Sequence, residues 1–434
     1  MRMSGVARRV CRPAIVLAAG ALLFGASNAS AAIYTATTTQ EFVDDVAAAN
    51  ASIGVPDEIQ LLSATTYSPT AGVVVTDDLS IRGNPTLQLP PGAPTIFNGA
   101  GIPPTDDPIT VAEGVTLHVE AIQFQGQAVS QKPYINVQGN FVIENSTISS
   151  AQGAAIATDP VATAPHITVR NATLTSNIRL GLNLSSNGLL TMNNATVTNN
   201  SQGGMILDGT ADIRNSVLAP NTAGNCFNAN YPNPTDTVSI NFSTDADGNN
   251  DGVPDCSTID PTGGTGNNTG TANTSAAVGV SATFGANGGP VRTRAITATS
   301  TLLKDTADNA ACEKLDARYF VRTDGACDRG AYELNAVRDT TPPSCGVTAV
   351  RRNGPAGHDE QDVGVQDMES GLQEIFGTNA NGSFNITNGT VSVPTFTRGT
   401  NAQQTVTATK TDQTQKTRWS FNARDWAGNV TLCQ

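Results

Sequence analysis

One stretch of the sequence has the residue types and the spacing of a calcium-binding loop. Counted from Asp247, side-chain oxygens fall at positions 1, 3, 5 and 9, glycine stands at position 6, and position 7 could add a main-chain carbonyl. Ca²⁺ takes oxygen ligands at such spacing, although position 12 is Thr258 and not a bidentate carboxylate. The predicted ligands of a structural Ca²⁺ are Asp247, Asn249, Asp251, Val253 and Asp255. The alternative is an ordinary polar loop, closed by a disulfide.

A second set of residues could act in the cleavage of a bond by proton transfer. Arg170 and Arg214 stand at equivalent places in a repeated pattern, and Glu144 stands one repeat before Arg170. A basic group beside a carboxylate can transfer the protons that such a cleavage needs. No paired aspartates accompany these three catalytic candidates. The alternative is a solvated column in which Glu144 and Arg170 form an ion pair worth under about 1 kcal/mol.

The two tryptophans have different expected roles. Trp426 follows a short strand in a turn, where its ring could stack on a sugar, and Trp419 lies within an alternating strand and is expected in an apolar core. The three histidines are far apart in sequence, and His118 alternates within a predicted strand. No Ser/His/Asp grouping is visible.

The repeat itself predicts the fold. Asn145, Asn171, Asn194 and Asn215 each follow a short strand, at spacings of 26, 23 and 21 residues, and Ala121 extends the series back by 24. A drifting period in the low twenties without helices predicts a β-solenoid, whose stacked coils share a core that one coil cannot form. Asparagine tolerates the left-handed backbone of such turns, and its side chain can bond to the next asparagine in a ladder. We therefore predict an all-β chain built on a right-handed parallel β-helix.

Residues 38–50 are predicted to form a helix. Thr38 and Glu41 have capping-box spacing, and Phe42, Val43, Val46 and Ala49 fall on one face. A single amphipathic helix followed by strands is expected to cap the open end of a β structure.

The sequence is predicted to consist of four parts. Residues 1–31 resemble an export signal, with a basic start, an apolar run and a small-residue cleavage site. Residues 32–338 form the β-helix and a disulfide-tied C-terminal region, and the Pro-containing 339–344 is a linker. Residues 345–434 alternate in short strands and predict a small immunoglobulin-like β-sandwich.

Six cysteines remain after the leader, and an even count in an exported protein favours disulfides. Fifteen pairings are allowed, of which sequence order suggests one set. That set is Cys226–Cys256, Cys312–Cys327 and Cys345–Cys433.

Composition excludes several classes of protein. Only 14% of the residues are charged, the formal net charge is −13, and there is no basic run, which argues against nucleic acid as a partner. Beyond the leader no segment approaches the roughly eighteen apolar residues that cross a bilayer. The oligomeric state is not predicted.

Several motifs resemble known families. Asn287-Gly-Gly-Pro290, Asp316, Arg318 and the string from Cys327 to Glu333 resemble the "choice-of-anchor Q" region of bacterial exported β-helix proteins of the pectin-lyase-like class. The segment Asp316-Ala-Arg318-Tyr-Phe departs from the usual Asp-Gln-Arg-Gly of that region. The motifs Asp367-x-x-Ser-Gly-Leu and Asp425-Trp-Ala-Gly-Asn are similar to bacterial immunoglobulin-like domains, and the loop after Asp247 resembles the calcium loops of thrombospondin type-3 and dockerin-like repeats.

These resemblances imply a bacterial protein that is secreted or held at the cell surface, but no single activity. Lyases of this fold use an arginine or lysine base beside carboxylate-bound Ca²⁺, and its hydrolases use paired aspartates. We expect a non-enzymatic role in binding or adhesion to carbohydrate or extracellular matrix, because polar β-helix faces suit extended polymers. The alternative is a polysaccharide lyase or glycoside hydrolase, and fold analogy alone does not separate the two.

Overall fold

The computed structural model describes most of the chain beyond the leader. The described residues are 31–62, 66–83, 94–228, 237–247, 255–260, 264–270, 272–322, 325–352, 358–378, 384–397 and 399–434. The predicted export signal therefore lies outside the described residues, except for its last position.

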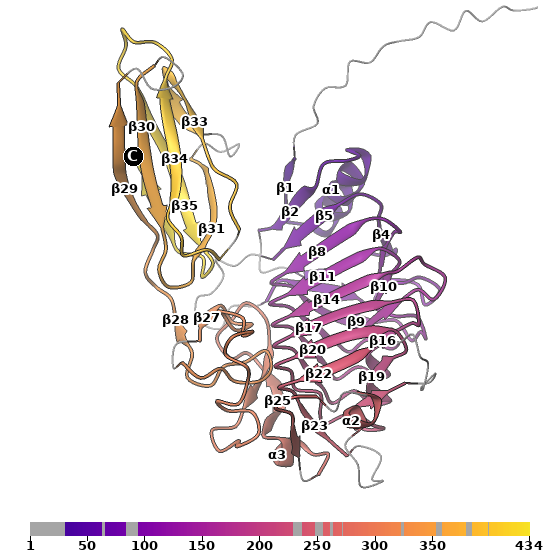
Figure 1. Cartoon of the computed structure of the whole chain (residues 1–434). Coiled ribbons are helices and arrows are strands. Elements are labelled where there is room, and N and C mark those ends of the chain that lie inside the picture. Colours follow the sequence, from indigo (N-terminus) through magenta and orange to yellow (C-terminus); the bar gives the residue numbers. More distant parts are fainter. Residues whose placement is uncertain are drawn as a thin grey trace, which may run out of the picture.

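Parallel strands stack into a solenoid with three sheets (Figure 1). The first sheet has nine strands: β1 (Ile33–Ala36), β2 (Asp57–Leu61), β5 (Leu79–Arg82), β8 (Thr116–Glu120), β11 (Asn140–Glu144), β14 (His166–Arg170), β17 (Leu189–Asn193), β20 (Thr210–Arg214) and β22 (Val238–Asn241). The second has seven: β4 (Val73–Val75), β7 (Ile109–Val111), β10 (Ile135–Val137), β13 (Ile156–Thr158), β16 (Leu180–Leu184), β19 (Gly203–Leu207) and β21 (Cys226–Phe227). The third has six: β3 (Thr66–Tyr67), β6 (Ile96–Gly99), β9 (Gln123–Gln127), β12 (Thr147–Ser149), β15 (Thr173–Thr175) and β18 (Thr196–Thr198). The predicted all-β fold with a parallel β-solenoid is confirmed.

The repeated asparagines of the sequence lie in the turn between the first and third sheets. Asn145, Asn171, Asn194 and Asn215 have φ of 46°, 45°, 46° and 49°, and Ala121 has 59°. Asparagine is one of the few residues that adopts this left-handed conformation at low cost.

The asparagine ladder lies at a different turn from the one predicted. Asn177 Nδ2 donates to Asn200 Oδ1 at 2.9 Å, and Asn200 Nδ2 donates to Asn221 Oδ1 at 2.9 Å. All three side chains are buried at the turn after the third sheet. The asparagines of the left-handed turns bond instead to a later segment: Asn171 Nδ2 donates to the Leu315 carbonyl at 2.7 Å.

The predicted cap helix is α1 (Thr39–Ala51), with the Thr38/Glu41 capping box formed. It packs against the first strands of the solenoid and closes that end (Figure 1). Phe42, Val46 and Ala49 are buried in the solenoid core, whereas Val43 stays 37% exposed at the edge of the contact.

The chain after the solenoid returns along the third sheet. This covering segment, residues 272–338, contains α3 (Ser275–Val278), β25 (Val280–Gly285), β26 (Thr293–Ile296), β27 (Phe320–Val321) and β28 (Val337–Arg338). Before it come β23 (Thr244–Ala246), α2 (Asp255–Ile259) and β24 (Asn268–Gly270). Thr147 Oγ1 donates to the Arg292 carbonyl at 2.7 Å, and Thr175 Oγ1 accepts from Arg294 Nε at 2.8 Å. The threonine-rich face of the third sheet is therefore buried and not open to a polymer.

The Asp316–Arg318 pair noted in the sequence is a buried part of the covering segment. Arg318 Nη2 lies 2.6 Å from Asp316 Oδ2, and the guanidinium packs over the ring of Tyr332 at 3.8 Å. Because both charges are paired and hydrogen-bonded, their burial is tolerated.

Two antiparallel sheets form a sandwich at the C-terminal end. One has the order β29 (Ser344–Arg351), β30 (Glu360–Gln366), β34 (Gln404–Lys410) and β33 (Gly389–Ser392). The other places β31 (Leu372–Gly377), β32 (Asn385–Thr387) and β36 (Val430–Cys433) on β35 (Arg418–Asp425). Val363, Val406 and Phe421 lie in the apolar core between the sheets.

The three disulfides follow sequence order: Cys226–Cys256, Cys312–Cys327 and Cys345–Cys433. The last joins β29 to β36 within the sandwich. Within the part of the chain that the structure describes, no helix is long and apolar enough to cross a membrane.

Candidate functional site

Two of the three catalytic candidates and Trp426 meet in one hollow. The Trp426 hollow has a volume of about 200 Å³ and lies where solenoid, covering segment and sandwich come together. The solenoid contributes Glu144, Asn145, Arg170 and Asn171, the covering segment Glu313, Lys314 and Leu315, and the sandwich Ser370, Gly399 and Trp426.

Strand register explains why Glu144 and Arg170 are neighbours. Both are the last residues of adjacent strands of the first sheet, where Glu144 is the direct partner of Arg170. The same column continues through Asn193 to Arg214, which lies outside the hollow and pairs with Asp212 at 3.3 Å. The two arginines are thus equivalent in the coil, as predicted, but only Arg170 lines the hollow.

Glu144 and Arg170 are part of a row of interacting ionisable side chains. Glu144 Oε1 lies 2.8 Å from Arg170 Nη1, and its Oε2 lies 3.3 Å from His118 Nε2. Arg170 Nε in turn lies 3.9 Å from Glu313 Oε1. Arg170 remains 47% exposed while Glu144 is 12% exposed, so the guanidinium is the more accessible of the two groups.

The charged neighbours keep Glu144 ionised. Burial by itself would raise the pKa of Glu144, but the hydrogen bond and charge of His118, together with Arg170, outweigh it and lower the pKa below its ordinary value. A carboxyl that serves as general acid needs a raised pKa instead. Glu144 is therefore suited to accept hydrogen bonds and not to donate a proton.

Lys314 brings a second cation to the hollow. Burial lowers the pKa of its ammonium group, and the nearby carboxylates of Asp367 and Asp339 oppose that shift. Its Nζ hydrogen-bonds Asn401 Oδ1 of the sandwich. Lys314 thus links the covering segment to the sandwich at the rim of the site.

Trp426 forms one wall of the hollow and packs between the domains. It lies against a buried cluster of Ala121, Leu315 and Tyr319, against which the partly buried Val321 also packs. Its main-chain N–H donates to the Gly371 carbonyl at 2.8 Å, which fixes the turn. An indole held in this way offers an apolar surface beside charged groups, the combination that polar ligands with an apolar face require.

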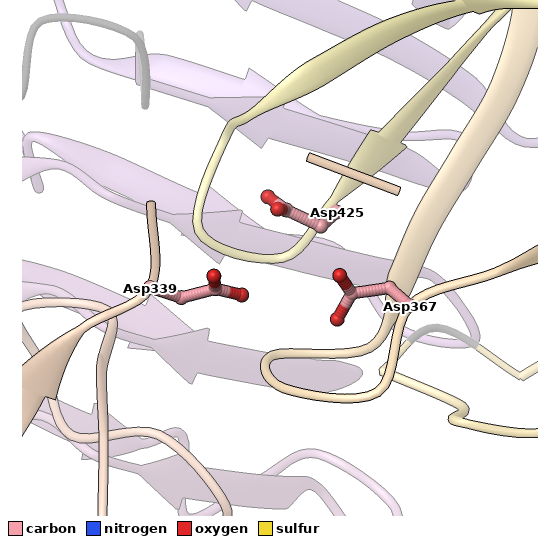
Figure 2. Close-up of side chains that lie close together, drawn as sticks. All are labelled: Asp339, Asp367 and Asp425. Atoms are coloured by element: carbon pink, nitrogen blue, oxygen red, sulfur yellow. The ribbon is translucent and has the colours of Figure 1, made fainter. Parts of the chain in front are cut away.

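A cluster of three buried carboxylates lies next to this site. Figure 2 shows the side chains of Asp339, Asp367 and Asp425 converging from the linker, from the turn after β30 and from the end of β35. One oxygen from each lies within 4.8 Å of the others, and the residues are 2%, 3% and 0% exposed. Such oxygen atoms are the ligands that Ca²⁺ takes, and three carboxylates would fill three of its roughly six to eight positions.

Backbone amides hold the cluster in place. Asp339 Oδ2 accepts from Ser370 N at 2.9 Å, Asp367 Oδ1 from Glu369 N at 3.1 Å, and Asp425 Oδ1 from Asn429 N at 2.7 Å. Burial raises the pKa of Asp425 to about 7, helped by the charges of Asp339 and Asp367 and opposed by the hydrogen bonds from Asn429. The cluster ties the linker to the sandwich.

The predicted calcium loop falls largely on residues that the structure does not describe. Asn249, Asp251 and Val253 lie outside the described residues, and Asp247 and Asp255 border the gap. The carboxylate of Asp255 is buried and accepts the main-chain N–H of Asn225 at 2.6 Å. This predicted ligand is therefore also part of the last solenoid turn.

The second sheet offers no catalytic group at the centre of its outward face. Its in-register residues there are Val74, Thr110, Asn136, Ala157, Asn183 and Ile206. None of these described residues is ionisable.

Sequence reasoning missed Glu313, Lys314 and the carboxylate cluster. Asp367 and Asp425 were visible in the two sandwich motifs, and Asp339 opens the linker, but nothing in their spacing brings them together. No protein-family model and no curated protein sequence matches this chain.

Proposed function

We propose that this protein is an exported binding protein that engages carbohydrate, alone or in an extracellular matrix, through the Trp426 hollow. The observation that carries the proposal is the meeting of an indole with Arg170 and Glu144 in one concave site. Stacking on the indole and hydrogen bonds to the two charged groups supply the mixed apolar and polar contacts that fix a small ligand.

The charges of the site favour binding over cleavage. Glu144 has a lowered pKa, and Arg170 lies between the carboxylates of Glu144 and Glu313. A lyase base must take a proton from the sugar, whereas the Arg170 guanidinium is engaged in ion pairs with both carboxylates. The alternative, a polysaccharide lyase or glycoside hydrolase, has support from the fold class but not from this arrangement.

We also propose which families the three parts of the chain belong to. The solenoid, the covering segment and the sandwich match the order of a right-handed pectin-lyase-like β-helix, a choice-of-anchor Q region and a bacterial immunoglobulin-like domain. The disulfides support an oxidising, extracellular location after removal of the leader. A secreted or cell-surface bacterial protein is the setting that these features support.

Retention on immobilised polysaccharides tests the function. Purified mature protein is applied to polygalacturonate, alginate, cellulose and mannan, while reducing ends and unsaturated sugar products are followed in the same samples. We expect retention on at least one polymer without product. Release of product that Arg170→Gln abolishes would overturn the binding proposal in favour of the enzyme.

Arg214 supplies a matched control for Arg170. Both arginines end strands in the same column and both side chains are 47% exposed, but only Arg170 lines the hollow. We expect Arg170→Gln to weaken retention at least tenfold and Arg214→Gln to leave it unchanged. Equal losses in both variants would show that the general charge of the sheet, and not the hollow, retains the polymer.

A further inference from the structure

A second hollow lies on the sandwich, where β35 changes its strand partner. β36 pairs with Phe421–Arg424 of β35, and β32 pairs with Arg418–Ser420. A hollow of about 410 Å³ opens at this changeover. Its wall includes Gln361, Asn385, Thr417, Arg418, Trp419 and Ser420.

Trp419 is fixed in place at this hollow. Its Nε1 donates to Gln361 Oε1 of the opposite sheet at 3.2 Å, and its ring stacks on Phe421 with centroids 5.5 Å apart and planes at 22°. Phe421 is fully buried, so Trp419 covers the end of the core instead of forming its centre. The sequence assigned Trp419 to the core, and the structure places it at the boundary of core and solvent.

The indole borders open space on more than one side. A smaller hollow of about 160 Å³ shares Trp419, Thr417 and Gln361 with the larger one. A ligand that meets a side chain already held by a hydrogen bond and a stacked ring loses little conformational entropy on binding. Trp419 therefore has the properties of a preorganised stacking platform.

The polar groups around the platform are almost all uncharged. Asn385 is exposed at the hollow, where its side-chain amide can both donate and accept hydrogen bonds. Hydroxyls from Thr417 and Ser420 add groups that both donate and accept. Gln434 also lines the hollow, and among the described side chains that line it Arg418 is the one that is charged.

We propose that this hollow is a second saccharide site, which takes a neutral sugar by stacking on Trp419 and hydrogen bonding to Asn385. An aromatic wall with a few convergent polar groups, in a hollow within the roughly 300–1,000 Å³ of typical ligand pockets, is the usual form of a small-molecule site. Its lining, with Arg418 as the one charged side chain, contrasts with the Trp426 hollow, where two carboxylates and two cations gather. The inference does not depend on what the Trp426 hollow binds.

The two tryptophans of the chain allow each hollow to be followed separately. Trp426→Phe leaves Trp419 as the only indole, and Trp419→Phe leaves Trp426. Each single-tryptophan protein is titrated with cellotetraose, mannotetraose and maltotetraose, and with tetragalacturonate as the charged comparison. Near-ultraviolet circular dichroism and the melting temperature confirm that each variant is folded.

We expect at least one neutral tetrasaccharide to change the Trp419 emission saturably, and Asn385→Ala to weaken that binding at least tenfold. Asn422→Ala is the matched control, because Asn422 lies on the same strand as Trp419 and does not line the hollow. No response of Trp419 to any of the three neutral sugars would overturn the inference. An equal response to tetragalacturonate would overturn the assignment to neutral sugars.

The same titrations separate the two sites. A response of Trp426 without one of Trp419 supports the proposed function and refutes the second site. A response of Trp419 alone supports the second site and removes the tetrasaccharides as ligands of the Trp426 hollow.

Discussion

At the scale of single residues, Glu144 connects the solenoid to the ligand site. It accepts from Arg170 and contacts His118, and it is 12% exposed. Replacing Arg170 or His118 would leave a largely buried carboxylate with fewer groups to compensate its desolvation. The expected loss of stability is larger than for an exposed ion pair. The pair is thus a positioning element for the hollow as well as a part of its surface.

The pH dependence of glycan retention follows from the lowered pKa of Glu144. A carboxylate whose pKa is lower in the folded state stabilises the folded site fully at pH values above its ordinary pKa of 4.5. This stabilisation is lost as the pH falls through the lower pKa of the folded state. We expect this carboxylate to remain ionised down to pH 4.5, and retention to be lost only in more acidic buffer. In Arg170→Leu one of the lowering charges is gone, so any residual retention should be lost at a higher pH.

At the scale of elements, the asparagine ladder fastens successive coils. Asn200 donates to Asn221 Oδ1 and accepts from the side chain and the main-chain N–H of Asn177. Removing the Asn200 side chain takes the acceptor from the Asn177 main-chain N–H and one of two donors from Asn221 Oδ1, which keeps the Asn200 main-chain N–H.

We expect Asn200→Ala to lower the free energy of unfolding by about 3 kcal/mol, since several buried groups each lose about 1 kcal/mol or more. Asn183→Ala is the control: Asn183 lies half-buried on the outward face of the second sheet and should change stability by less than about 0.5 kcal/mol. Chemical denaturation of the mature protein measures both. Equal effects would mean that the ladder adds nothing beyond ordinary packing.

The calcium prediction belongs to the loop that begins at Asp247. We expect Ca²⁺ to raise the melting temperature of the mature protein and a chelator to reverse the rise, because an ion that binds the oxygen ligands of the folded chain stabilises it against the unfolded one. Asp251→Asn should abolish the rise.

Asp367→Asn is the comparison, since Asp367 belongs to the separate carboxylate cluster at the sandwich (Figure 2). A calcium-dependent rise that persists in Asp251→Asn but disappears in Asp367→Asn would contradict the loop prediction and locate the cation at the linker.

At the scale of the whole molecule, the covering segment joins the solenoid to the sandwich. Its Tyr319 Oη donates to Glu120 Oε1 at 2.7 Å, and its Leu315 packs in the same apolar cluster as Trp426. The lining of the Trp426 hollow comes from the solenoid, the covering segment and the sandwich, so its shape depends on how these three parts pack together.

We expect Leu315→Ala to loosen this joint, because Leu315 is only 3% exposed and a buried leucine truncation costs about 2–5 kcal/mol. The measurable results are a larger radius of gyration by small-angle scattering and weaker glycan retention, with the far-ultraviolet circular dichroism unchanged. Leu302→Ala, on the other apolar cluster of the covering segment, should leave the radius unchanged. An unchanged radius in Leu315→Ala would show that this cluster does not hold the domains together.

Local pattern was sufficient to determine the repeating fold. The spacing of Asn145, Asn171, Asn194 and Asn215 identified the coil, because the left-handed turn restricts which residues can stand there. The capping box of Thr38 and Glu41 located the end helix for the same kind of reason, since its hydrogen bonds span only three residues. The solenoid needed no long-range information, because each coil contacts mainly its neighbours.

Only the tertiary structure decided which faces are open and which residues form a site. Residues 272–338 return along the third sheet, bury its threonine face and accept hydrogen bonds from the turn asparagines. The periodicity of the sequence does not predict such a contact. Arg170 and Arg214 are indistinguishable in the repeat, yet docking of the sandwich places Arg170 in a hollow with Trp426 and leaves Arg214 outside it. The sequence determined the coil through local backbone and packing rules, whereas the site depends on contacts between segments more than two hundred residues apart, as in Glu144 and Trp426.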